Sequence, residues 1–79
     1  DPELAAKALV NLGRLRERSG DFERAGASYR AAIDTGDAEA APRAAINMAK
    51  LHEKDGDFAD ASAFYQSAID SGHPEHAPQ

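Results

Sequence analysis

The sequence of 79 residues has no cysteine and no tryptophan, and it contains only one methionine. Without cysteine the chain can form no disulfide bond and no thiolate metal site. This fits a reducing compartment. The first residues, Asp1-Pro2-Glu3-Leu4, lack the basic region of a signal peptide. We therefore expect a cytoplasmic protein.

Long apolar runs and excess positive charge are also missing. No stretch approaches the roughly 18 consecutive apolar residues of a membrane span, so we expect no membrane partner. The net charge of −5 disfavours nonspecific binding to nucleic acid. A chain of this length makes one small domain and buries about 60% of the surface that its unfolded form exposes.

Residue patterns of catalysis and of cofactor binding are lacking as well. There is no Ser-His-Asp context, no phosphate-binding glycine loop and no isolated carboxylate pair in an expected pocket, so we predict no enzyme activity and no cofactor. His73 and His76 flank Glu75 but have no third fixed ligand, and we interpret them as linker residues and not as a metal site. His52 is expected to pack between repeats or to face solvent.

What the chain does contain is a repeat with a period of 36 residues. The segment SGDFERAGASYRAAID at residues 19–34 returns as DGDFADASAFYQSAID at residues 55–70. Aligning residues 8–42 with residues 44–78 gives 17 identities in 35 positions. A period of about 20 to 50 residues is typical of arrays in which each unit is one supersecondary element that cannot bury its apolar face alone.

The apolar spacing inside each unit is helical. Ala8, Leu12 and Leu15 share one face of a first helix, and a second helix has apolar residues from Phe22 to Ile33 at helical intervals. Small residues, namely Gly13, Ala25, Ala49 and Ala61, stand where two helices would approach closely. The residues that we expect to fill the space around them are Phe22, Tyr29, Phe58 and Tyr65.

Turn residues separate these helices. Gly20 and Gly56 supply the left-handed position that ends a first helix, Asp21 and Asp57 are placed to cap the next helix, and Pro42 suits a first turn. The sequence thus predicts an all-α fold of two tandem antiparallel helix-turn-helix repeats, part of an α-solenoid. The expected helices lie near residues 3–18, 22–35, 41–54 and 58–71.

The motifs resemble the tetratricopeptide repeat. Two features depart from it. Each unit is 36 residues long instead of 34, and the positions where the family usually has large aromatics hold Leu9, Ala45, Arg16 and His52. Because the added length lies in the linkers, a resemblance to the longer Sel1-like repeat is a more distant alternative. The residues that carry the resemblance are Asn11-Leu12-Gly13, Gly20-Asp21-Phe22, Ala25, Tyr29 and Ala32, and then Asn47-Met48-Ala49, Gly56-Asp57-Phe58, Ala61, Tyr65 and Ala68.

The predicted organisation is one repeat at residues 1–36, a second at 37–72, and a linker with the start of a truncated third repeat at 73–79. Because such arrays need about three units and polar caps, we expect either a piece of a longer array or self-association. Phe64 replaces Ser28 of the first unit. It predicts a contact between repeats or subunits, or simply partial burial beside the linker.

The resemblance implies that the first helices line a concave groove that binds an extended protein or peptide segment. Seven of the nine basic residues lie on these helices, and this favours acidic side chains or a C-terminal carboxylate as the ligand. Asn47 matches one family position for carboxylate-ended partners, but Val10 stands where a lysine is expected and Arg14 replaces an asparagine. The candidate peptide-binding residues are Lys7, Asn11, Arg14, Arg43, Asn47 and Lys50.

Other interpretations of the same residues stay open. The basic stripe is also what an ordinary solvated helix face looks like, with Arg18 and Lys54 complementing helix C-termini. The repeats could serve as self-assembling or spacer units that stack end to end. They could also regulate another part of a larger protein.

Overall fold

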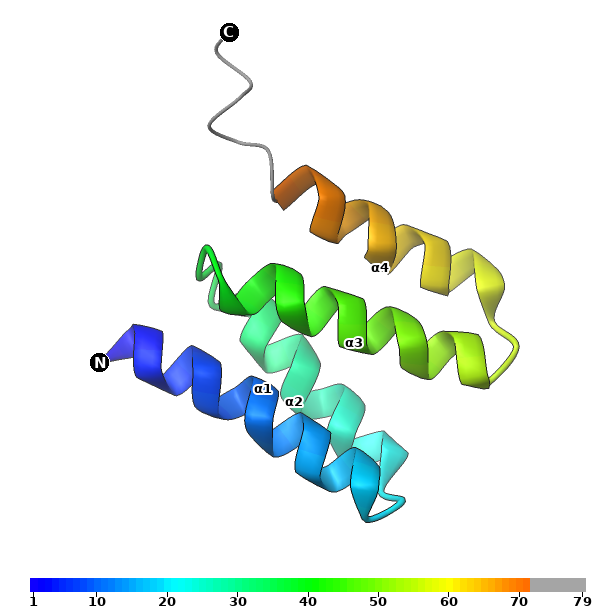
Figure 1. Ribbon diagram of the computed structural model, residues 1–79, viewed down its shortest axis with the longest axis horizontal. Helices are drawn as coiled ribbons and strands as arrows, with labels where there is room; N and C mark the ends of the chain where they lie inside the picture. The colour runs from blue at the N-terminus through cyan, green and yellow to red at the C-terminus, as the bar shows by residue number, and fades with distance from the viewer. Residues whose placement is uncertain (72–79) are drawn as a thin grey trace, which may run out of the picture.

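The computed structural model describes residues 1–71, which form two helix hairpins (Figure 1). Among these residues there is no strand, which confirms the predicted all-α fold of two tandem helix-turn-helix repeats. Each helix begins and ends within about two residues of its predicted bounds. The four helices are α1 (Pro2–Arg18), α2 (Phe22–Asp34), α3 (Ala40–Lys54) and α4 (Phe58–Ser71).

Both turns have the expected glycine, and the first also has the expected aspartate cap, whereas the Asp57 carboxylate lies beside His52. Gly20 and Gly56 take left-handed φ angles of 84° and 79°, and the Asp21 carboxylate accepts a hydrogen bond of 3.2 Å from the backbone N–H of Arg24. Pro42 lies in the first turn of α3. The predicted linker and third-repeat start at residues 73–79, with His73 and His76, lie outside the described residues.

The hairpins pack through α2 and α3, and α1 also contacts α3. In Figure 1, α1 and α3 lie side by side with α2 behind them, and α4 extends the row beyond α3. The core is built mostly from alanine, so the helices approach closely. Its buried residues are Ala6, Val10, Ala25, Tyr29, Ala32, Ala40, Ala44 and Met48.

The buried face of α1 differs from the apolar face suggested by the sequence. Leu12 is 37% exposed and Leu15 is 59% exposed, and Ala8 is exposed too, whereas Ala6 and Val10 are buried. In α3 the equivalent residues of the apolar face are covered, since Ala44 and Met48 are buried and Leu51 is half-buried. The difference arises because this face of α3 packs on α2 of the preceding repeat, whereas no helix within residues 1–71 packs on the same face of α1.

The predicted roles of the aromatic residues need a similar correction. Tyr29 is fully buried, but Phe22 is 52% exposed and Phe58 is 66% exposed, so the phenylalanines do not fill the interior of their hairpins. Both stand at the first position of their helices, at the rim of the hairpin. Phe64 is half-buried and packs against the core that the two repeats share, which agrees with the predicted contact between repeats.

Within residues 1–71, no helix is both long enough and apolar enough to span a bilayer.

Candidate functional site

The residues predicted to bind a peptide line a groove between α1 and α3, which we call the basic groove. Its larger hollow has a volume of about 400 Å³. A smaller hollow of about 110 Å³ lies toward the start of both helices, and Arg43 lines both. The larger hollow is lined by Arg14, Glu17, Arg18, Arg43, Asn47, Lys50 and Lys54, and the smaller one by Lys7, Val10, Asn11, Glu39, Ala40 and Arg43.

All six candidate residues therefore line one continuous surface. They do so because the stripe of each first helix repeats after 36 residues and α1 lies beside α3. Arg14, Arg43 and Lys50 are exposed, whereas Asn47 is half-buried between the two helices. The amide of Asn47 is thus a partly covered polar group on the floor, with cationic side chains around it.

Glu17 belongs to the groove, and the sequence analysis missed it. Its carboxylate accepts a hydrogen bond of 2.8 Å from the Tyr29 hydroxyl and lies 3.1 Å from the Lys54 ammonium. The same tyrosine contact recurs in the second repeat, where Tyr65 donates to Glu53 at 2.8 Å. The signal was present in the sequence, because both the glutamate and the tyrosine are identical in the two units.

These contacts affect the ionisation of Tyr29. Burial of the ring raises the pKa of Tyr29, and the hydrogen bond to Glu17 raises it further. The hydroxyl therefore stays protonated and acts as a donor. Glu17 is held at a fixed place in the groove by a residue of the core.

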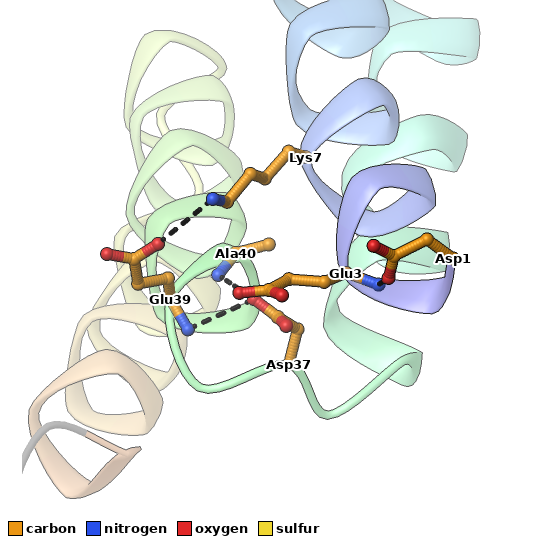
Figure 2. A network of polar contacts seen from close by, with 6 residues as sticks. All are labelled: Asp1, Glu3, Lys7, Asp37, Glu39 and Ala40. Atoms are coloured by element: carbon orange, nitrogen blue, oxygen red, sulfur yellow. Dashed lines mark hydrogen bonds and ion pairs between the residues drawn. The ribbon is translucent and has the colours of Figure 1, made fainter.

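Lys7 is engaged at the other end of the groove, as Figure 2 shows. Its ammonium lies 3.4 Å from the carboxylate of Glu39, which stands just before α3. The Asp37 carboxylate accepts hydrogen bonds from the backbone N–H groups of Glu39 and Ala40, at 3.1 and 2.8 Å, and so caps the start of α3. The Lys7 pair therefore ties α1 to a well-ordered turn.

The charges of the groove fall into two groups. Lys7 and Lys54 each have a carboxylate partner. Among residues 1–71, no ion pair involves Arg14, Arg43 or Lys50. Within the same residues no ion pair involves Arg18, which also lines the larger hollow. The groove is therefore cationic except at Lys7 and Lys54, whose charges are neutralised by residues of the chain itself.

A further hollow, separate from the basic groove and about 500 Å³ in volume, lies between α2 and α3. Gly26 lines this hollow, and a Cβ at that residue would meet the Met48 sulfur at 3.8 Å. Two cations cover aromatic rings beside it: Lys54 lies 5.7 Å from the Phe22 ring, and Arg30 lies 5.8 Å from the Phe64 ring. The sequence analysis did not anticipate this hollow.

Comparison with known protein families gave two matches. One tetratricopeptide repeat model matches residues 8–41, and a second matches residues 42–71. Searches of curated proteins and of solved structures returned no match. Tetratricopeptide repeats form a non-catalytic scaffold that generally mediates protein–protein interaction. Since the two matched segments follow one another and together include both helix hairpins, the chain belongs to the tetratricopeptide repeat family.

Proposed function

We propose that the basic groove binds an extended peptide segment through its carboxylates, either acidic side chains or a C-terminal carboxylate. The observation that carries the proposal is the central trio of Arg14, Arg43 and Lys50, which surround one hollow and have no ion-pair partner within residues 1–71. The net charge of the chain is −5, so this local excess of cations runs against its composition.

The chemistry of the groove suits a carboxylate better than a neutral peptide. Charge-assisted hydrogen bonds are stronger than neutral ones, and an arginine can bind a carboxylate with two parallel N–H donors. Asn47, half-buried on the floor, offers an amide that can hydrogen-bond the peptide backbone. Glu17 and Glu39 neutralise Lys54 and Lys7, so a carboxylate is attracted mainly to the other cations of the groove.

The test is a titration of the chain with short acidic peptides that carry a free C-terminal carboxylate. We expect the double substitution Arg14→Glu and Lys50→Glu to weaken binding at least about tenfold, since hydrogen bonds to charged groups contribute about 1.5 to 3 kcal/mol each. Binding to the unmodified chain should weaken as salt rises, because the groove is open to solvent. Amide NMR shifts of Asn47 and its neighbours would report the site.

The matched control reverses two arginines outside the groove, Arg24→Glu and Arg30→Glu. It changes the net charge by the same amount, so any loss of binding that comes from overall charge alone appears in both double variants. Equal weakening by the two variants would contradict the proposal. So would peptide binding that does not depend on salt.

Self-association is a second candidate function, and the apolar ends of the array favour it. Leu4 of α1 is 65% exposed and Leu15 is 59% exposed, although the α3 residues at the same repeat positions are at least half-covered. At the other end, Phe58 and Ile69 of α4 are 66% and 53% exposed. Stacking α4 of one copy on α1 of the next would repeat the contact between α2 and α3, and such head-to-tail contacts build open chains.

Sedimentation velocity over a wide range of protein concentrations tests this second candidate. We expect the average mass to rise with concentration, and we expect Leu15→Glu to suppress the rise because a charge would be buried in the contact. High salt should leave the association unchanged or strengthen it, in contrast to peptide binding. A chain that stays monomeric at the highest concentration would rule out stacking.

A further inference from the structure

The turn between α3 and α4 holds a polar cluster that plays no part in the groove. Two backbone hydrogen bonds of a helix-ending motif hold this turn. The N–H of Asp57 donates to the carbonyl of His52 at 2.9 Å, and the N–H of Gly56 donates to the carbonyl of Glu53 at 3.0 Å. Gly56 has the left-handed φ of 79° that this motif requires. The side chains of His52 and Asp57 therefore leave a rigid frame on the same side of the turn.

One pair of donor atoms in this cluster has the spacing of metal ligands, and a third donor lies near it. The Nδ1 atom of His52 lies 3.4 Å from the nearer carboxylate oxygen of Asp57. With one carboxylate oxygen of Asp60, all three donor atoms fall within 4.8 Å of one another. A distance of 3.4 Å is long for an N–H···O hydrogen bond, but two ligands held about 2.0 to 2.1 Å from a tetrahedral ion are separated by about this much.

The imidazole is oriented by an aromatic neighbour. The ring of Phe64 stacks on His52 with centroids 5.3 Å apart and planes inclined by 13°. Stacking fixes the plane in which the ring nitrogens present their lone pairs. The His52 side chain is 27% exposed and that of Asp57 is 45% exposed, so an ion can reach the donor atoms from solvent.

The first repeat provides an internal comparison, because the same corner there is built for another purpose. The residues at the positions of His52 and Asp60 are Arg16 and Arg24. Arg24 pairs with Asp21 at 3.6 Å, and Arg16 donates a hydrogen bond of 2.9 Å to Ser28. In the second repeat both arginines are replaced by metal-binding residue types, and the serine that held one of them is replaced by the phenylalanine that stacks on the histidine.

We propose that His52, Asp57 and Asp60 bind a divalent first-row transition-metal ion such as Zn²⁺, with water completing the coordination. One imidazole and two carboxylates suit this class better than Mg²⁺ or Ca²⁺, which prefer oxygen ligands alone. Bound metal would clip the end of α3 to the start of α4 and stabilise the second repeat, because an ion that binds only the folded chain shifts the folding equilibrium. The sequence analysis predicted no metal site, since these ligands are scattered over a turn and match no familiar spacing.

Calorimetric titration of the full chain with Zn²⁺ tests the proposal. All measurements use a chain that carries His73→Gln and His76→Gln, so that these two imidazoles contribute nothing. We expect saturable binding of one ion per chain. Substituting a ligand, as in His52→Gln or Asp60→Asn, should weaken binding by about tenfold or more, a loss at least as large as that seen when a residue supporting a ligand is removed.

The matched control is Asp21→Asn, which changes the equivalent aspartate of the first repeat and should leave Zn²⁺ affinity unchanged. A second readout is the melting temperature, which Zn²⁺ should raise for the unsubstituted site and not for Asp60→Asn. Asp60 is exposed, so this variant is expected to fold. Absence of saturable binding would overturn the proposal, and so would equal affinities for the unsubstituted site and the two ligand variants.

Discussion

Gly13→Ala is expected to lower the free energy of unfolding by about 1 to 2 kcal/mol. A Cβ at this position would lie 2.5 Å from Cε1 and 2.6 Å from Cδ1 of Tyr29, far inside van der Waals contact. The ring cannot move aside freely, because it is fully buried and its hydroxyl is bonded to Glu17. Overpacking of this kind costs about 1 to 3 kcal/mol or more, which outweighs the gain of about 1 kcal/mol in helix propensity.

Urea unfolding followed by circular dichroism measures this loss, and Gly26→Ala is the matched control. Both glycines lie inside helices, but a Cβ at Gly26 would meet only the end of Met48, at 3.8 and 3.9 Å. Gly26→Ala should therefore raise stability by about 0.5 to 1 kcal/mol. If both variants were stabilised, the close approach of α1 to Tyr29 would be contradicted. The second repeat accepts Ala49 at the position of Gly13, and its Tyr65 is only half-buried.

Met48→Ala should cost about 2 to 3 kcal/mol and weaken the connection between the two repeats. Met48 is 5% exposed, and it is the largest α3 side chain in the core that the hairpins share. Its removal loses apolar burial and enlarges the neighbouring hollow between α2 and α3. Because that hollow is already open to solvent, the loss falls at the lower end of the usual range for such truncations. Urea unfolding provides the measurement.

Leu12→Ala and Met48→Leu are the controls for this prediction. Leu12 occupies the position of Met48 in the first repeat but is 37% exposed, so its truncation should cost less than about 1 kcal/mol at low protein concentration. Met48→Leu keeps the volume and should also have a small effect. Equal losses of unfolding free energy for Leu12→Ala and Met48→Ala would show that the face of α1 that carries Leu12 is covered, as stacking between copies would require.

The helices and their turns could be predicted from the sequence because their causes are local. Glycine at the left-handed positions, aspartate at the helix starts and apolar residues at helical spacing act within a few residues of one another. The repeat supplies each signal twice, so Gly20 and Gly56 predict the same type of turn in the two units. Agreement between these signals explains why the helix bounds were predicted closely.

Burial could not be predicted in the same way, because it depends on which elements are neighbours. The same face of a first helix is exposed at Leu12 and buried at Met48, although the two units are alike in sequence. Only the position of a unit in the array decides this. Phe22 illustrates the related error for aromatics, since its place at the start of α2 exposes half of the side chain despite its size.

The candidate groove was predicted in part. Periodicity alone placed the cations on one stripe, and the contact between α1 and α3 brings the two stripes together. Their partners could not be foreseen, because the Lys54 pair with Glu17 spans 37 residues of sequence. The contact between His52 and Asp57 depends on turn geometry, and no periodic pattern reveals it.

Glu17 links the basic groove to the environment of the buried Tyr29. Its carboxylate holds the Lys54 ammonium on one side and the hydroxyl of the buried Tyr29 on the other. A ligand that draws Lys54 away from Glu17 changes the charge next to that hydroxyl. Since the chain has no tryptophan, its near-ultraviolet signal comes mainly from Tyr29 and Tyr65. The protein thus carries a natural optical probe whose environment responds to what occupies its surface.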